Sequence, residues 1–479
     1  MDRPSVPRHL PATLAELRES GWRSRTVKAE LRANLLARLA QGGDIVPGIV
    51  GYEDSVIPAI ENAILAGQDL VFLGERGQAK TRLARSLVNL LDEWLPIVAG
   101  GELNDDPTSP ISPAARAAVD EHGDRTPIDW LPRDRRYAEK LATPDITIAD
   151  LIGEVDPIRV AEGRYLSDEL TLHYGLIPRA NRGIFALNEL PDLAERIQVG
   201  LLNILEERDV QIRGFVVRLP LDLFVVASAN PEDYTSRGRI ITPLKDRLGS
   251  QVRTHYPKTL DHEIAIVRQE KLRFPEGDTP PIVVPAFMEE LVAEITHLAR
   301  RSPEISQRSG VSVRVSVANM EVLEATSLKR AVRLGEAVAA PRISDLGAVM
   351  ASTAGKVELE SVGDDTPEER VVERLITKAL FATFNRRVSV DRLDDVISAF
   401  EEGLVVETGE RVPSREYVRW MRETPGLEDA VRRLGALDAA DGAAEPALVA
   451  SGVEFLLEGL HLQRRLNKDR GAAGVVYRR

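Results

Sequence analysis

The sequence predicts an α/β fold in the first half of the chain and an all-helical fold in the second half. Three observations support this prediction. Short apolar runs that suit buried strands lie at Leu70–Leu73, Gly183–Leu187 and Leu223–Ala227. A glycine-containing turn separates the first of these runs from a helical pattern. Beyond Thr254, apolar residues recur at three- and four-residue spacing in one segment after another, which is typical of helices.

The composition narrows the class of protein. The 479 residues include 43% hydrophobic and 29% charged side chains, which indicates a globular protein with more than one domain. A net charge of −13 argues against nucleic acid as the default partner. The absence of cysteine excludes disulfides, thiolate metal sites and thiol nucleophiles. No apolar stretch approaches the roughly 18 residues that cross a membrane, so we expect a cytoplasmic protein.

Helices are predicted around the first strand. The expected helices lie within residues 12–41, 56–65 and 82–95. Clusters of Asp, Pro and Gly between Ala99 and Asp145 predict a long surface insertion with one short helix, Ala114–Asp120. Regular structure then returns as a strand, a helix over Leu193–Glu207 and a further strand. The alternation around Gly214 predicts a β-hairpin over Val210–Leu219.

The second half is expected to be helical throughout. The predicted helices lie at residues 264–271, 285–301, 315–334, 370–384 and 393–404. A linker rich in Ala, Gly and Asp over Gly435–Pro446 precedes a last helix, Leu448–Leu466. The basic end, Lys468–Arg479, is expected to be a solvated, frayed tail.

A phosphate-binding loop is predicted at Gly74–Thr81, because this octet lies between a buried strand and the start of a helix. Its backbone N–H groups would form an anion cradle, Lys80 would reach the β- and γ-phosphates, and the Thr81 hydroxyl would bind Mg²⁺. Ala79 replaces the usual last glycine, and we expect its methyl group to crowd the approach of phosphate. For the octet alone, an ordinary turn with a chance Lys-Thr pair is the alternative.

Polar residues follow the two later strands. Asn188 and Glu189 stand where an ATPase places the Asp that holds Mg²⁺ through water and the Glu that activates the attacking water. Glu189 fits its role, whereas Asn188 keeps an oxygen but removes a negative charge. A solvated strand end is an equal alternative for this pair alone. Asn230 follows the third strand and could orient the lytic water or sense the γ-phosphate.

Two arginines complete the pattern, although each one taken singly is more often a surface ion-pair former. Arg247 lies in the run Thr242–Leu248, and Arg314 lies in the helical half. The order of all these elements resembles that of AAA+ ATPases, over roughly residues 45–405. It is most similar to the branch that contains the ATPase subunit of magnesium chelatase and the MoxR-type ATPases. The run Ala-Asn-Arg-Gly-Ile at residues 180–184 is the most specific part of the resemblance.

The resemblance implies a role for each candidate residue. Lys80 and Thr81 correspond to Walker A, and Asn188 and Glu189 to Walker B. Asn230 then looks like sensor 1, Arg247 like an arginine finger that reaches the nucleotide of a neighbouring subunit, and Arg314 like sensor 2. The candidate catalytic residues are thus Glu189, Asn230, Arg247 and Arg314. The candidate nucleotide-binding residues are Gly74, Glu75, Arg76, Gly77, Gln78, Ala79, Lys80, Thr81 and Asn188, with Thr81 and Asn188 also serving Mg²⁺.

The resemblance also implies a domain order and an assembly. We expect an N-terminal helical segment at 1–44, an AAA+ α/β nucleotide-binding domain at 45–255 with an insertion at about 99–145, a helical lid at 256–405 and a C-terminal helical extension at 406–479. Ile152–His173 would form an insertion in helix 2. ATP and Mg²⁺ are the expected cofactors, and a finger acting in trans implies a ring, usually a hexamer.

Three functions remain open at this point. The first is an ATP-hydrolysing ring motor with a MoxR-like chaperone or metal-insertion role, working with a von Willebrand factor A-domain partner in trans. The second is a helicase-like nucleic-acid motor, which Arg213 and Arg218 on the hairpin could serve. The third is a nucleotide-binding scaffold with weakened hydrolysis, which Ala79 and Asn188 suggest. The client cannot be predicted from these motifs.

Overall fold

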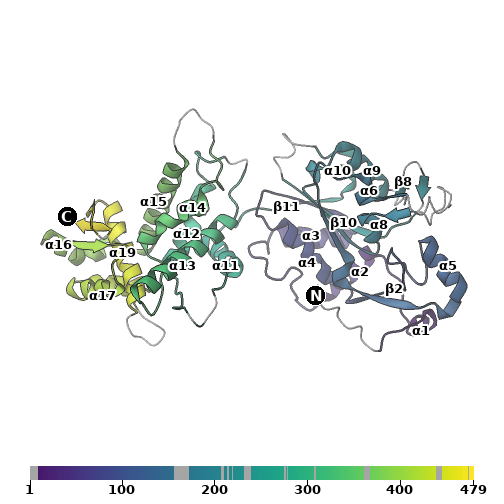
Figure 1. Ribbon diagram of the computed structural model, residues 1–479, viewed down its shortest axis with the longest axis horizontal. Coiled ribbons are helices and arrows are strands. Elements are labelled where there is room, and N and C mark those ends of the chain that lie inside the picture. Colours follow the sequence, from purple (N-terminus) through teal and green to yellow (C-terminus); the bar gives the residue numbers. More distant parts are fainter. Residues whose placement is uncertain are drawn as a thin grey trace. The chain divides into compact units, whose positions relative to one another are not determined.

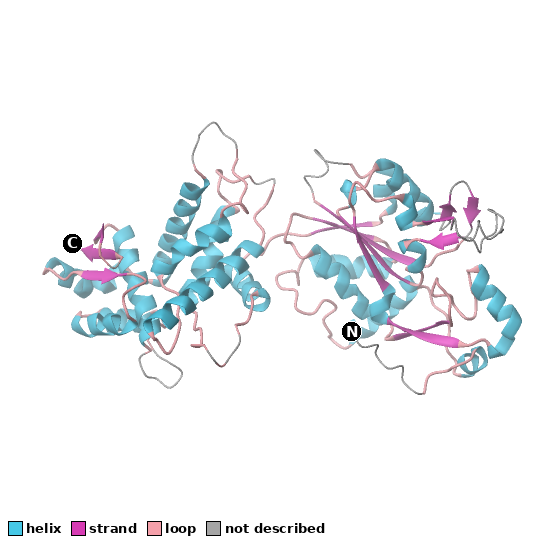
Figure 2. Cartoon of the chain, viewed as in Figure 1, coloured by secondary structure: helices cyan, strands magenta, loops and turns pink. Residues whose placement is uncertain are grey.

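The chain divides into two units, Met1–His255 and Tyr256–Arg479. The structure, a computed structural model, describes residues 9–155, 172–206, 210–212, 215–217, 219–230, 239–274, 277, 279–306, 309–360, 367–437, 445–472 and 474–479. The first unit is α/β and the second is mainly helical, so the predicted fold class is confirmed (Figures 1 and 2). Among the described residues, no helix has both the length and the apolar character that crossing a membrane requires.

A five-stranded parallel sheet forms the centre of the first unit. Its spatial order is β11 (Ser250–Arg253), β1 (Leu70–Leu73), β10 (Leu223–Ala229), β7 (Gly183–Asn188) and β4 (Tyr137–Leu141). All four residues of β1 are buried. Continuous apolar strands of this kind are expected where helices cover both faces of a sheet. Because all strands run the same way, their carboxyl ends lie along one edge.

Helices cover both faces of this sheet (Figure 1). One face packs against α2 (Val27–Ala40), α3 (Val56–Ala66) and α4 (Lys80–Ser86), with Phe72 and Ile184 in the shared core. The other face packs against α8 (Leu176–Arg179), α9 (Glu195–Glu206) and α10 (Thr242–Arg247), with Phe185 in the core. Successive residues of β7 therefore serve opposite cores, as the two-residue period of a strand requires.

The predicted surface insertion at 99–145 is wrong at its C-terminal end. Tyr137–Leu141 forms the edge strand β4 of the central sheet, where Leu141 pairs with Asn188. Upstream, β2 (Trp94–Val98) pairs with β3 (Ile128–Pro132), and α5 (Pro113–His122) contains the one expected helix. The sequence Tyr-Ala-Glu-Lys-Leu of β4 has no apolar run, because an edge strand is only partly covered.

The predicted helix at 82–95 is also shorter in the structure. Helix α4 ends at Ser86, a 3₁₀ turn follows at Leu87–Leu90, and the chain enters β2 at Trp94. The buried residues Leu83, Leu87 and Leu90 continue the helical spacing across this junction. The apolar periodicity alone therefore could not show where the helix ends.

Two antiparallel pairs lie beside the main sheet. Strands β8 (Val210–Ile212) and β9 (Phe215–Val217) pair, which confirms the predicted hairpin. Strand β5 (Gly153–Val155), which follows α6 (Ile148–Leu151), pairs with β6 (Leu172–Tyr174) at the two ends of the predicted helix 2 insertion. Residues 156–171 of that insertion and Arg213 and Arg218 of the hairpin lie outside the described residues.

The sequence predicts a separate N-terminal segment at 1–44, but the structure builds this segment into the first unit. Helix α1 (Leu14–Glu19) packs near β3, and α2 contributes Leu31 and Leu35 to the core under the sheet. Glu30 of α2 is 2% exposed and accepts hydrogen bonds from both terminal nitrogens of the buried Arg136, each at 2.6 Å. A buried ion pair thus joins α2 to the turn before β4.

In the second unit, the largest hydrophobic core spans the boundary predicted between a lid and a separate extension. Its helices are α11 (Leu260–Glu270), α12 (Ala286–Ala299), α13 (Arg314–Leu334), α14 (Val349–Thr353), α15 (Glu368–Arg387), α16 (Asp394–Glu401), α17 (Ser414–Glu423), α18 (Leu427–Arg433) and α19 (Pro446–Leu462). A single hydrophobic cluster includes residues from both sides of position 405. The ring of Phe455 on α19 lies 4.5 Å from Phe287 and 5.8 Å from Phe384, measured between centroids.

The predicted frayed tail is wrong. Strands β13 (Asn467–Arg470) and β14 (Val475–Arg478) form a hairpin, and β14 also pairs with β12 (Val406–Thr408). Tyr477 is buried and donates a hydrogen bond to Glu458 of α19. Burial, with the neighbouring Glu458 carboxylate, raises the pKa of Tyr477. Only alternate residues of β14 face the core, so the apolar signal is too short to recognise.

Removing the carboxylate of Glu30 tests whether α2 belongs to the first unit. Glu30→Ala leaves the guanidinium of Arg136 buried without its counter-charge, and such a loss costs about 3–5 kcal/mol of unfolding free energy. Urea unfolding measures the change in unfolding free energy, and hydrogen exchange of the β7 amides shows whether the first unit is affected. Asp124→Ala is the control, because it removes the exposed partner of Arg18 and should change stability little. Equal stability of the two variants would contradict the structural role of α2.

Candidate functional site

The predicted site residues of the first unit gather at the carboxyl edge of the central sheet. Strands β1, β7 and β10 end at Leu73, Asn188 and Ala229. The loop at 74–79, Glu189 and Asn230 follow these strands directly. In open parallel sheets, the crevice outside the strand ends is the usual place for a ligand.

Lys80 is the central cation of the site. It is the first residue of α4 and only 7% exposed. Its ammonium donates hydrogen bonds to the carbonyl oxygens of Gly74 and Glu75, the latter at 3.1 Å, and to Oδ1 of Asn230. An ammonium has three N–H donors. Neutral oxygens of the loop and of β10 are among the acceptors that hold this buried charge.

Asn230 links Lys80 to Glu189. While its Oδ1 accepts from Lys80, its Nδ2 donates to Oε2 of Glu189 at 2.8 Å. Glu189 lies in the left-handed backbone region, with φ 54° and ψ 48°. Such a conformation costs on the order of 1–3 kcal/mol in a non-glycine residue and is common at functional sites. The structure therefore brings together Lys80, Asn230 and Glu189, which the sequence predicts as separate motifs.

Asn188 is held by side chains that the sequence analysis missed. Its Nδ2 donates to Oε1 of Glu139 on β4 at 2.6 Å, and its Oδ1 accepts from Oγ of Ser228 on β10 at 3.2 Å. The other oxygen of Glu139 accepts from Nε of Arg85 on α4 at 2.7 Å. No sequence signal marked Glu139, because β4 was assigned to the insertion, and Ser228 lay hidden inside an apolar strand.

The turn at Gly74 is shaped by close packing. Oε1 of the buried Gln78 accepts from the Glu75 N–H at 3.0 Å and from Oγ1 of Thr254 at 2.7 Å. A Cβ atom on Gly74 would lie 1.8 Å from the Thr254 hydroxyl and 2.2 Å from Oε1 of Gln78. Only glycine therefore fits at the first position of the loop.

Tyr52 fixes the same loop from another direction. Its hydroxyl lies 2.9 Å from the carbonyl oxygen of Gln78 and 2.8 Å from that of His255. Burial raises the pKa of Tyr52 to about 12, so the hydroxyl keeps its proton at neutral pH. This contact gives a structural reason for a tyrosine at position 52.

Ala79 affects the loop through its backbone conformation. Its φ of 58° and ψ of 16° place it in the left-handed region, where glycine is favoured. Its methyl group packs against the core beneath α4, and the expected crowding of phosphate by this methyl group stays a prediction. The substitution of the usual glycine also costs backbone strain, on the order of 1 kcal/mol.

The positions of the remaining predicted residues do not test the roles predicted for them. Arg76 is exposed on the loop, Thr81 is the half-buried second residue of α4, and Gly77 adopts a positive φ of 76°. Arg247 ends α10, and its Nη1 donates to the Pro243 carbonyl at 3.0 Å. Arg314 is the exposed first residue of α13 in the second unit. The roles of finger and of sensor 2 therefore stay predictions.

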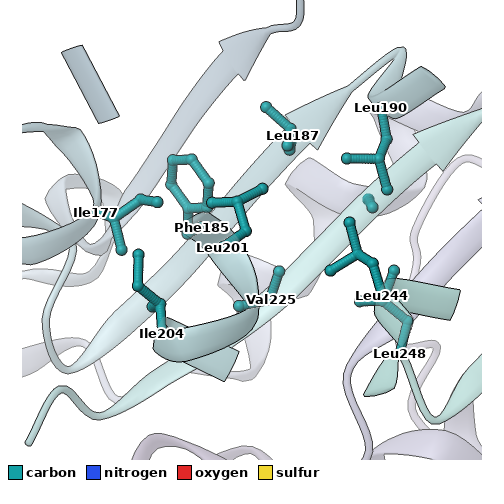
Figure 3. A pocket seen from close by; sticks show the side chains of 10 residues that line it. Ile177, Phe185, Leu187, Leu190, Leu201, Ile204, Val225, Leu244 and Leu248 are labelled. Atoms are coloured by element: carbon teal, nitrogen blue, oxygen red, sulfur yellow. The ribbon is translucent and has the colours of Figure 1, made fainter. Parts of the chain in front are cut away.

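A cavity under α8, α9 and α10 lies apart from these residues (Figure 3). It measures about 20 Å³ and is lined only by apolar side chains, among them Phe185, Leu201 and Leu244. A dry space of this size and lining is a packing gap in the core rather than a ligand site. Across the described parts of both units, no group of three or more His, Asp and Glu side chains is arranged to hold a metal.

Comparisons with known proteins find similarity over parts of the chain. The Sigma-54 interaction domain family matches residues 162–250. Magnesium-chelatase subunit ChlI of Oryza sativa subsp. indica is 26% identical over 250 residues, which cover 47% of this chain and 55% of the relative. The chain thus spans about half the length of the curated relatives that it matches.

Two solved structures also align with much of the chain. NtrX from Brucella abortus in complex with ATP aligns with 73% of this chain and 66% of its own, at 16% identity and a TM-score of 0.37. A chain in the complex of subunits BchI and BchD of magnesium chelatase aligns with 68% of this chain and 97% of its own, at 20% identity and a TM-score of 0.34.

The loop, its lysine and the two strand ends define the class as a P-loop nucleotide-binding fold. With the motif order, the sequence matches support an AAA+ ATPase of the branch that contains the magnesium chelatase ATPase subunit and the MoxR-type ATPases. The resemblance predicted from the sequence is confirmed at this level.

Replacing Ala79 by glycine tests the strain in the loop. Ala79→Gly should raise the unfolding free energy of the first unit by roughly 0.5–1 kcal/mol, because glycine adopts positive φ without a Cβ clash. Ala84→Gly, in the interior of the same helix, should lower it by about 1 kcal/mol or more. Urea unfolding of both variants measures the two changes. A loss of stability in both would show that position 79 is not strained.

Proposed function

We propose that the chain binds ATP with Mg²⁺ and hydrolyses it to ADP and phosphate. The observation that supports this proposal most is the hydrogen-bonded series Lys80, Asn230 and Glu189, which joins the loop to the ends of β10 and β7. It places a buried cation for phosphate next to an amide and a carboxylate that suit a water molecule. Phosphoryl transfer needs this kind of positioning and charge neutralisation more than it needs covalent chemistry.

Nucleotide binding would exchange the partners of Lys80. Its ammonium contacts the neutral carbonyl oxygens of Gly74 and Glu75. Phosphate oxygens carry negative charge, and charge-assisted hydrogen bonds are roughly twice as strong as those to neutral acceptors. The β- and γ-phosphates would therefore displace the carbonyls, while backbone N–H groups of the loop at 74–79 hold the remaining oxygens.

The oxygen donors beside the loop fit Mg²⁺. Thr81 contributes a hydroxyl at the start of α4, and Asn188 contributes an amide oxygen that Ser228 orients. Mg²⁺ prefers oxygen ligands and keeps several waters, so Thr81 would bind it directly and Asn188 through water. When bound, Mg²⁺ neutralises charge on the phosphates.

Hydrolysis would depend on Glu189 and Asn230. The carboxylate of Glu189 would accept a hydrogen bond from the attacking water and orient it towards the γ-phosphate. The amide of Asn230 fixes one oxygen of that carboxylate, which keeps its direction defined. Arg314 of the helical unit would supply positive charge to the phosphates. Arg247 would supply positive charge from a neighbouring copy, so we propose that the copies form a ring, as a hexamer.

We further propose that this cycle drives remodelling, or the insertion of a metal or cofactor, together with a von Willebrand factor A-domain partner. The curated relatives are named as subunits of magnesium chelatase, which supports a role within a larger assembly. The scaffold without turnover is the second candidate, because Asn188 removes a charge from the Walker B position. Nothing in the described residues favours a nucleic-acid motor.

Two substitutions separate binding from turnover. Lys80→Ala should lose ATP binding, because it removes the cation of the cradle, whereas Glu189→Gln should bind ATP and release no phosphate. Equilibrium binding of a fluorescent ATP analogue and a phosphate-release assay measure the two steps. Lys28→Ala, on α2, is the control and should behave as wild type. Binding without phosphate release by the wild type would favour the scaffold, and no binding at all would refute the proposal.

The finger role of Arg247 predicts complementation between inactive copies. Arg247→Ala should lower phosphate release on the order of 10³-fold or more while ATP binding persists. Mixing Arg247→Ala with Lys80→Ala should restore part of the activity, because the second variant supplies Arg247 to nucleotide held by the first. Lys245→Ala, a cation lost from the same helix, serves as the control. A mixture as inactive as its components would rule out action in trans.

A further inference from the structure

Glu139 lies on the same face of the sheet as Asn188. In the parallel register, Glu139 pairs with Ala186 and Leu141 pairs with Asn188. Side chains at alternate positions of a strand share a face, so Glu139 and Asn188 project from neighbouring strands on one side. This is the side covered by α4, because Ile184 of the same alternating set packs in the core with Leu83.

The carboxylate of Glu139 is directed at Asn188. Its Oε1 lies 2.6 Å from Nδ2 of Asn188, and the side chain is 20% exposed. Its second oxygen contacts Arg85, whose side chain is 65% exposed, and an ion pair with such an exposed partner is weak. A carboxylate has about four acceptor positions, so Glu139 keeps capacity for a water molecule.

The same contacts place Glu139 near the start of α4. Thr81 and Arg85 are four residues apart on this helix, so they share a face and lie one turn from each other. Arg85 touches Glu139, and Thr81 lies one turn closer to the loop. Thr81, Asn188 and Glu139 are thus three oxygen-bearing residues on one side of the sheet edge.

The side chain of Asn188, at the Walker B position, is a neutral amide. It therefore cannot supply the negative charge that stabilises a hydrated divalent cation. Glu189 does not replace that charge, because its carboxylate is bonded to Asn230 on the Lys80 side. Glu139 is the carboxylate that reaches Asn188 itself. The amide between them fixes its orientation by donating Nδ2 to Glu139 and accepting from Ser228.

We propose that Glu139 is a metal-positioning residue, whose carboxylate accepts a hydrogen bond from a water on nucleotide-bound Mg²⁺ and so supplies the charge that Asn188 lacks. This inference rests on the proposed binding of ATP with Mg²⁺. It assigns to an edge strand a part of the site that is normally carried by the Walker B strand.

Exchanging the two side chains tests the proposal. Glu139→Gln alone should weaken Mn²⁺ binding to the protein–ATP complex about tenfold or more, as the loss of an outer-sphere partner of a metal typically does. The double variant Glu139→Gln with Asn188→Asp keeps one carboxylate and one amide in contact, and it should restore the affinity. Electron paramagnetic resonance of Mn²⁺ measures binding, and ATP affinity in EDTA should stay unchanged in both variants.

Arg85→Gln separates positioning of the metal from support of the helix. If Glu139 acts only by tethering α4 through Arg85, then Arg85→Gln will reproduce the loss of Mn²⁺ affinity, and the proposal is overturned. Retained affinity in Arg85→Gln supports it. Unchanged Mn²⁺ affinity in Glu139→Gln, or no recovery in a folded double variant, also overturns it. Absence of ATP binding by the wild-type protein instead refutes the proposed function, and this inference with it.

Discussion

The buried ammonium of Lys80 is the contact on which the rest of the site depends. It holds the carbonyls of Gly74 and Glu75 and the amide of Asn230, which in turn holds Glu189. One cation therefore links the ends of β1, β10 and β7. A buried charge needs such compensation, since an uncompensated one would cost several kcal/mol. The loop is consequently preorganised around a cation, which we propose binds phosphate.

Two residues with strained backbone conformations lie near this contact. Ala79, which directly precedes Lys80, and Glu189 both adopt left-handed backbone conformations. The core beneath α4 holds Ala79. Glu189 is held by the hydrogen bond that its backbone N–H donates to Oγ of Ser228 and by the one that its carboxylate accepts from Asn230. Residues under such strain persist only where neighbouring contacts impose it. The edge strand β4 adds Glu139 to the same network through Asn188 and Ser228.

The sequence predicted the centre of the fold better than its edges. Strands β1, β7 and β10 are covered on both faces, so their sequences are continuous apolar runs. Because the strands are parallel, the polar residues that follow them lie close together at one edge of the sheet. Strand β4 is half-covered and carries Glu139 and Lys140, which concealed it. Glu139 was therefore missed with its strand. The direction of the Ala79 methyl group also depends on backbone conformation, which residue type alone does not determine.

In the second unit, the helices could be predicted from apolar periodicity, but the contacts between them could not. Phe455 packs against Phe287 and Phe384, which are distant in sequence, so the core crosses the expected boundary at 405.

A structure of the chain with Mg²⁺ and a non-hydrolysable ATP analogue tests the account most directly. We expect the ammonium of Lys80 to have left the carbonyls of Gly74 and Glu75 for the β- and γ-phosphates, with Asn230 still bonded to Glu189. An analogue bound elsewhere, with Lys80 still on both carbonyls, would contradict the account.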